Sequence, residues 1–151
     1  MEGVSIRPIV PNDWNHWRQL WSHYLNFYST SVSEEVYETA FSRLLSDAPS
    51  EFNGFVAVYN EKLIGIAHYL FHRSLWTVED TCYLMDLFVE PEFRCKGVGR
   101  SLIDTVYIEA MNFGLTGVYW MTQEFNYSGR MLYDQVASKT PFIVYEKIRE
   151  Y

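Results

Sequence analysis

A glycine-rich turn between an apolar strand and an apolar helix constrains this chain more than any other part of its sequence. Residues 82–89 have the composition of a strand that Pro91 ends, and Arg94-Cys-Lys-Gly97-Val-Gly99 follows soon after. Apolar residues at helical spacing start at Leu102. The first N–H groups of such a helix lack intrahelical partners, and glycines let an anion approach them closely. The pattern therefore predicts a strand–loop–helix unit that binds a pyrophosphate.

The same G-x-G turn is also typical of a plain connection between a strand and a helix, with its Arg and Lys side chains in solvent. Both interpretations stay open on these residues alone. Two other phosphate-binding loops are excluded. A dinucleotide-binding fold needs a third glycine at position 102, which is Leu102. A P-loop needs Gly-Lys followed by Ser or Thr, and the sequence has no such triplet.

Strand and helix patterns along the rest of the chain indicate the fold class. We expect strands over 5–10, 55–59, 63–71, 82–89, 118–121 and 141–147, and helices from Asp13, after Ser31-Val-Ser-Glu34, over 102–111 and over 128–136. The short connection at 60–62 predicts an antiparallel hairpin, and the later strand–helix–strand order predicts a parallel pair. We therefore predict an α/β (α+β) fold, a mixed and mostly antiparallel twisted sheet of about six to seven strands flanked by helices. The apolar run 118–121 is expected in the interior of that sheet.

Composition narrows the class of protein. The chain of 151 residues predicts a single domain over 1–151, and its formal net charge of −7 argues against nucleic-acid binding. Cys82 and Cys95 show no zinc-ligand spacing, so we expect no metal and a reduced, cytoplasmic setting, with the nucleus as the alternative. The sequence has neither a signal-peptide pattern nor a run of ~20 apolar residues, so no membrane partner is expected.

Several separated motifs together resemble the GNAT superfamily of N-acetyltransferases. They are the strand end Val89-Glu-Pro91, the segment Arg94-x-x-Gly-x-Gly99, the run 118–124, and Leu132-Tyr-Asp134. With Trp76, they resemble the branch that holds histone/polyamine and D-amino-acid N-acetyltransferases. The resemblance implies the acyl-CoA N-acyltransferase fold and acetyl-CoA as the co-substrate, with no metal.

The resemblance also implies where acetyl-CoA binds. The backbone of Leu87, Phe88 and Val89 would pair with the pantetheine amides. The diphosphate would rest on a set of consecutive residues, namely Arg94, Cys95, Lys96, Gly97, Val98, Gly99, Arg100 and Ser101. Asn126 would bond the pantetheine arm, although an Asn at this position is equally typical of a helix N-cap. Gly129 stands where the family often has Ala, which suggests a looser helix start.

Catalytic roles follow from the same resemblance. Tyr133 would be the general acid that protonates the CoA thiolate, because a phenol stays protonated at neutral pH; its alternative is a structural tyrosine. Asp86 or Glu124 would bind the ammonium or accept its proton, and either carboxylate could instead be structural. A backbone N–H near Phe88 would stabilise the oxyanion. His68 and His72 are expected to be structural.

The acceptor is less defined than the donor. An aromatic wall around a cationic substrate could be formed by Trp76, Tyr28 and Tyr24. Each of the two tyrosines, taken alone, is more simply interpreted as a core residue. We expect direct attack of a small primary amine, such as a polyamine or amino acid, on the thioester in a ternary complex. The alternatives are a protein acetyltransferase, acting on histone Lys or on N-termini, and a non-catalytic acyl-CoA-binding module. Tyr119, Trp120 and the strand at 142–145 suggest a subunit edge, so a homodimer or higher homo-oligomer is expected.

Overall fold

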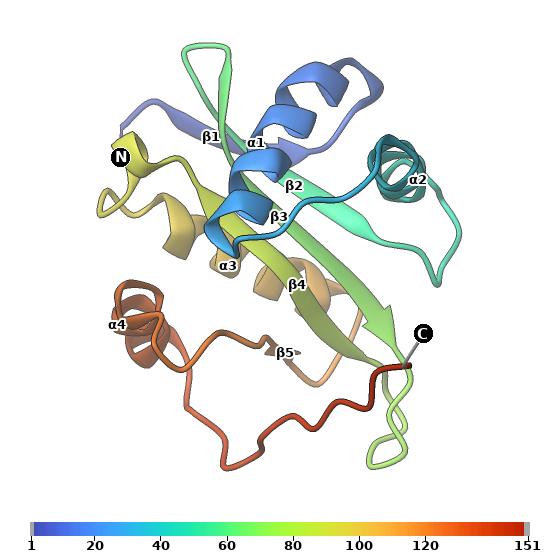
Figure 1. Ribbon diagram of the computed structural model, residues 1–151. Helices are drawn as coiled ribbons and strands as arrows, with labels where there is room; N and C mark the ends of the chain where they lie inside the picture. Colours follow the sequence, from blue (N-terminus) through green and yellow to red (C-terminus); the bar gives the residue numbers. More distant parts are fainter. Residues whose placement is uncertain (1, 150–151) are drawn as a thin grey trace. The chain divides into compact units, whose positions relative to one another are not determined.

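The computed structural model describes residues 2–149, and the chain divides into two compact units, Met1–Met121 and Thr122–Tyr151. The first unit holds a sheet with three α-helices, and the second holds one α-helix with an irregular tail (Figure 1).

The sheet of the first unit runs in the order β1-β2-β3-β4-β5 across the described residues. Its strands are β1 (Val4–Pro8), β2 (Asn53–Tyr59), β3 (Lys62–His72), β4 (Thr81–Val89) and β5 (Val118–Tyr119). The neighbours from β1 to β4 pair antiparallel, and β4 pairs parallel with β5. Asn60 and Glu61 adopt positive φ at the β2–β3 turn, so the predicted hairpin is confirmed. The mixed, mostly antiparallel fold class is confirmed as well.

Helices cover both faces of this sheet. On one face lie α1 (Trp14–Phe27) and α2 (Glu34–Leu44), whose buried residues share a cluster with Ile66 of β3. The next residue along, Gly65, points the other way: a Cβ there would lie 3.2 Å from Leu102 of α3 (Val98–Asn112). Alternation along a strand places successive residues on opposite faces, so α3 covers the second face.

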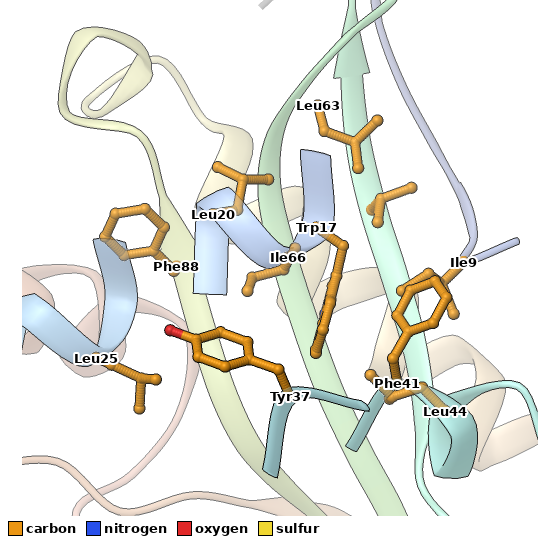
Figure 2. Close-up of a cluster of buried hydrophobic side chains, with 11 residues drawn as sticks. Ile9, Trp17, Leu20, Leu25, Tyr37, Phe41, Leu44, Leu63, Ile66 and Phe88 are labelled. Carbon is orange, nitrogen blue, oxygen red and sulfur yellow. The ribbon is translucent and has the colours of Figure 1, made fainter. Parts of the chain in front are cut away.

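The core of the first unit is built around one tryptophan. Trp17 is fully buried, and its ring centroid lies 4.9 Å from that of Phe41 (Figure 2). Ile66 and Leu20 flank the same cluster. One face of α1 contributes Trp17, Leu20 and Leu25 to this cluster, and α2 and the strands contribute the rest. Truncation of such a buried side chain typically costs about 3–5 kcal/mol.

A bulge changes the course of β4. The register places His68 opposite Asp86 but Tyr69 opposite Leu84, so Met85 is an extra residue on β4. On the other edge, β4 pairs with β5 only through Cys82 and Tyr83. From Leu84 onward, the described part of the first unit offers β4 no strand partner on that edge. The bulged half of β4 therefore presents an open backbone edge.

The second unit begins with a capped helix, α4 (Tyr127–Val136). The Asn126 Oδ1 atom accepts a hydrogen bond from the Gly129 N–H at 3.2 Å, and its Nδ2 donates to Thr122 Oγ1 at 2.9 Å. A Cβ on residue 129 would lie 2.6 Å from Asn126 Nδ2. Gly129 therefore makes room for the cap, and the looser helix start stays a prediction.

Two strand predictions need correction. Residues 138–149 form no strand, and Phe142 and Tyr145 are largely exposed, so the predicted strand at 141–147 is wrong. The apolar run at 118–121 gives a strand of only two residues, at the edge of the sheet instead of its interior. The sheet described over residues 2–149 thus has five strands, fewer than expected. An apolar run shows that a segment can pair, but not whether a partner strand is present.

Candidate functional site

The loop after β4 leads directly into the first turn of α3. Glu90 fixes its start, because its N–H donates to Ile64 O at 2.9 Å and its Oε1 lies 2.7 Å from His23 Nδ1. Gly97 is the N-cap of α3 with φ 85°, and no side chain caps the helix there. The Ser101 N–H makes a helical bond to Gly97 O at 3.0 Å. The earlier N–H groups of this turn are thus arranged for an anion.

The cations of this loop fold back onto the protein. Arg94 Nε donates to Val89 O at 2.8 Å, and its guanidinium lies over the Phe88 ring at 5.3 Å. Lys96 Nζ donates to Glu92 O at 2.8 Å. These bonds brace the loop and keep two positive charges beside it.

The open edge of β4 precedes this loop without interruption. Phe88 and Val89 bury their side chains in the core. The register directs the backbone groups of Phe88 to β3 and those of Leu87 and Val89 to the open edge. An extended chain with amide groups can add to such an edge as a further strand. The open edge at Leu87–Val89 is followed along the chain by the turn at Gly97 that begins α3.

Asp86 lies beside the bulge, in a nest of hydrogen-bond donors. Its Oδ2 lies 2.8 Å from His68 Nδ1 and accepts the Trp21 Nε1–H at 3.3 Å. Tyr24 also donates to it. Burial favours the neutral acid, but the bonds from His68, Tyr24 and Trp21 outweigh it, so the pKa of Asp86 lies below its ordinary value. Asp86 is therefore ionised at neutral pH.

Aromatic rings surround this carboxylate. Tyr24 meets the Tyr28 ring edge-on at 5.1 Å and the Phe88 ring at 6.3 Å. Burial, with the charge of Asp86, raises the pKa of Tyr24, which stays protonated and keeps donating. The Asp86 side chain retains 13% exposure. A partly buried negative charge within aromatic rings is a favourable place for a substrate ammonium.

Sequence reasoning missed a second aromatic group near the start of β4. Tyr83 and Tyr119 stack with centroids 5.0 Å apart, and the Tyr119 hydroxyl lies 2.8 Å from His72 Nε2. Burial alternates along this part of β4, because Cys82 and Leu84 are buried while Tyr83 between them is more exposed. An alternating pattern of this kind is the signal that could have indicated the Tyr83 side chain. The extra residue Met85 interrupts this alternation between Tyr83 and Asp86. The sequence pattern therefore did not show how the side chains of these two residues are directed relative to each other.

Other predicted residues lie elsewhere. Trp76 is in the loop between β3 and β4 and is 86% exposed. Glu124, Asn126 and Tyr133 belong to the second unit; Glu124 is exposed, and Tyr133 is half-buried on α4. The N-cap alternative for Asn126 is what the structure shows. The first unit by itself brings together Asp86, the β4 edge and the glycine loop.

Among residues 2–149, no group of three or more His, Cys, Asp or Glu side chains is placed to hold a metal ion. No helix in this part of the chain has the length and apolarity needed to cross a bilayer.

Comparison with known proteins places these features in a family. The model of the acetyltransferase (GNAT) family matches residues 14–137. The chain is 38% identical to a D-amino-acid N-acetyltransferase of Saccharomyces cerevisiae (strain ATCC 204508 / S288c) over 146 residues, which cover 95% of this chain and 90% of the relative. It is 29% identical to a thialysine N-epsilon-acetyltransferase of Caenorhabditis elegans over 84 residues, 56% of this chain and 52% of that one.

Solved structures agree at the level of the fold. An aminoglycoside acetyltransferase, AAC(6')-Iy, in complex with a bisubstrate analogue is 20% identical with a TM-score of 0.83, covering 97% of this chain and 98% of that one. A ribosomal-protein-alanine N-acetyltransferase of Brucella melitensis biovar Abortus 2308 is 20% identical with a TM-score of 0.79, covering 97% and 99%. At such identities the similarity establishes the shared fold and no substrate.

Proposed function

The chain belongs to the acetyltransferase (GNAT) family, and on that basis we propose that it carries the acetyl group of acetyl-CoA to the primary amine of a small molecule. Family and relative together make it an acetyl-CoA-dependent N-acetyltransferase. The identity of the amine, the residues that act on it and their roles are the content of the proposal.

One observation carries the choice of a small amine. Asp86 is an ionised, partly buried carboxylate among aromatic side chains, at the bulge of the strand whose edge is open. A single ammonium on a flexible aliphatic chain fits one carboxylate and several ring faces. The named substrates of the two curated relatives, D-amino acids and thialysine, are small molecules with amino groups, and this agrees with the proposal.

The residues of the first unit fit acetyl-CoA, which would supply the activated acetyl group when bound. Leu87, Phe88 and Val89 offer the backbone edge for its amide-containing arm. The turn from Arg94 through Ser101, with Gly97 at positive φ, offers the N–H groups for its diphosphate. Cys95 also adopts positive φ, so its backbone follows the curve of the loop while its thiol is exposed.

Each proposed chemical role belongs to a residue of this chain. Asp86 orients the ammonium, and its low pKa makes it a better anchor than base. A backbone N–H near Phe88 is the proposed donor to the oxygen that gains negative charge, and that of Leu87 is the one that faces the open edge, because the Phe88 N–H is directed to Ile66 of β3. Tyr133 is the proposed acid for the departing thiolate, and Glu124 the proposed acceptor of the amine proton through water. Asn126 would bond the arm of the co-substrate through groups not used by its cap.

Trp76 and Tyr28 remain proposed substrate contacts. Tyr28 packs against Tyr24, which donates to Asp86, so it lies one ring away from the carboxylate. Trp76 lies on an exposed loop, where an aromatic side chain is available to a ligand. The single-domain organisation, the homodimer or higher homo-oligomer and the cytoplasmic location also stay predictions.

A substrate panel tests the proposal. Purified protein with acetyl-CoA is assayed for thiol release with spermidine, D-lysine, L-lysine, D-alanine and a histone-tail lysine peptide. We expect turnover of at least one small amine, with a higher kcat/KM than for the peptide. Selective turnover of the peptide would favour a protein acetyltransferase. Tight acetyl-CoA binding without turnover of any member would favour a non-catalytic module.

A substitution tests the proposed acid. Tyr133→Phe removes the phenolic proton and keeps the ring, so kcat should fall by about 10²–10⁴-fold. Tyr127→Phe, on the same helix and 72% exposed, is the matched control and should leave kcat unchanged. An unchanged kcat for Tyr133→Phe would remove Tyr133 from that role.

A further inference from the structure

A buried hydrogen-bond chain links the core to Asp86. Trp17 of α1 is fully buried, and its Nε1–H donates to His68 Nε2 at 2.9 Å. His68 of β3 is 4% exposed, and its Nδ1 lies 2.8 Å from Asp86 Oδ2. The chain thus runs from a helix through one strand to the next, and it ends on the carboxylate proposed to hold the substrate.

The direction of this chain fixes the tautomer of His68. An indole nitrogen can only donate, so His68 Nε2 must accept and carries no proton. The proton of the neutral ring is then on Nδ1, from where it is donated to Asp86 Oδ2. The Trp17 ring lies 5.9 Å from the imidazole and the Trp21 ring 6.3 Å from it, so the histidine is also packed in place.

The two located bonds to Asp86 end on the same oxygen. His68 Nδ1 and Trp21 Nε1 both contact Oδ2, and they come from β3 and α1. Two donors on one oxygen set the rotation of a carboxylate, because turning it would leave both donors buried without an acceptor. Oδ1 is then the oxygen that neither of these two donors contacts.

We propose that His68 is a positioning residue for the acceptor amine, which fixes Asp86 through Oδ2 so that Oδ1 meets the ammonium. The proposal rests on the proposed function, since it needs Asp86 to bind the amine. Without the His68 donor, Asp86 loses the bond that sets its orientation. The amine then binds less tightly, while acetyl-CoA, which is held by backbone groups of β4 and the glycine loop, is unaffected.

Two substitutions of His68 separate its two bonds. In Asn, the side-chain nitrogen takes the place of Nδ1 and can still donate to Asp86. In Gln, the side-chain oxygen takes the place of Nε2 and can still accept from Trp17, but the donor to Asp86 is lost. We expect His68→Gln to raise the KM for the best panel amine about tenfold or more, the usual effect of losing a bond to a charged group. His68→Asn should raise it no more than about twofold, and kcat and the KM for acetyl-CoA should change little in both.

Trp17→Phe is the control for stability. It removes the donor to Nε2 and lowers the Tm, but it leaves the bond from His68 to Asp86, so the amine KM should stay near the wild-type value. Any one of four results would overturn the proposal. They are an equal rise of the amine KM in His68→Gln and His68→Asn, no rise in either variant, a rise in His68→Asn alone, and a change confined to kcat. Turnover by the wild-type protein distinguishes these results from failure of the proposed function. If the wild-type protein acetylates no amine of the panel, the proposed function is wrong, and so is the role of His68.

A measurement on the wild-type protein avoids any dependence on variant folding. In ¹⁵N-labelled protein, the His68 imidazole should show a protonated Nδ1 and an unprotonated Nε2. Saturation with the best panel amine should shift the Nδ1–H signal, because the ammonium binds the same carboxylate. A proton on Nε2, or an Nδ1–H signal that the amine does not move, would overturn the proposal.

Discussion

The glycine loop and the Asp86 cluster hold their proposed ligands by opposite means. At the loop, Gly97 shapes the backbone while the side chains of Arg94 and Lys96 turn back to brace it, so N–H groups face the ligand. At the cluster, side chains from two elements, α1 and β3, converge on Asp86 of β4, so its geometry depends on packing. A backbone site tolerates changes of side chain but not of φ, whereas a packed carboxylate is sensitive to each of its partners.

The substitution with the largest expected effect disrupts the Asp86 cluster and leaves the glycine loop intact. Asp86→Asn keeps the shape of the side chain and removes its charge, so kcat/KM for the amine should fall by about 10²-fold, as for the loss of one partner of a buried charge pair. Calorimetric Kd for acetyl-CoA should stay within about twofold. Asp104→Asn, exposed on α3, is the matched control and should alter neither value. A parallel loss of acetyl-CoA binding would contradict the separation of the two regions.

The reciprocal substitution disrupts the glycine loop and leaves the Asp86 cluster intact. Gly97 has φ 85°, where a Cβ costs about 1–2 kcal/mol, so Gly97→Ala should weaken acetyl-CoA binding about 5- to 30-fold. The KM for the amine at saturating acetyl-CoA should stay unchanged. Gly117→Ala is the control, because that glycine lies outside the positive-φ region and a Cβ there meets nothing within 4 Å. Equal losses in the two variants would show that the positive φ is not what the loop requires.

Acid should weaken the contribution of the cluster to stability. The pKa of Asp86 is lowered by folding, so its contribution is present above the unfolded value and is lost as pH falls through the folded one. The difference in unfolding free energy between wild type and Asp86→Asn should therefore be constant near neutrality and shrink below about pH 4. Urea unfolding of both proteins at pH 7, 5 and 3 measures it. A difference that stays constant down to pH 3 would show that Asp86 does not titrate with folding.

The substitution with the smallest expected effect tests whether the glycine loop depends on the side chain of residue 95. Cys95 adopts φ 58°, which is strained for a residue with a Cβ, so Cys95→Gly should raise the unfolding free energy by at most ~1 kcal/mol. Acetyl-CoA affinity should change by less than about twofold, because the backbone N–H remains. Chemical unfolding with binding calorimetry checks both values. A clear loss of affinity would assign the Cys95 thiol a contact that the backbone description omits.

Local patterns were read correctly wherever a short segment carries its own information. The strand ending before Pro91, the turn at Gly97 and the helix after it appear as expected, since φ preferences and helical spacing act within a few residues. Asn126 caps α4 for the same reason. The strand at 141–147 failed because pairing depends on a partner far away in the chain.

The sequence by itself determined the order of the elements as far as α4 and the family, and it predicted the backbone loop for the co-substrate, because each depends on residues close together in the chain. Only the tertiary structure decided the surroundings of Asp86. The bulge at Met85 sets which residue of β4 faces His68, and Trp17 reaches that histidine across 51 positions of sequence. Register and long-range side-chain bonds are set by how helices and strands pack, which no local pattern records.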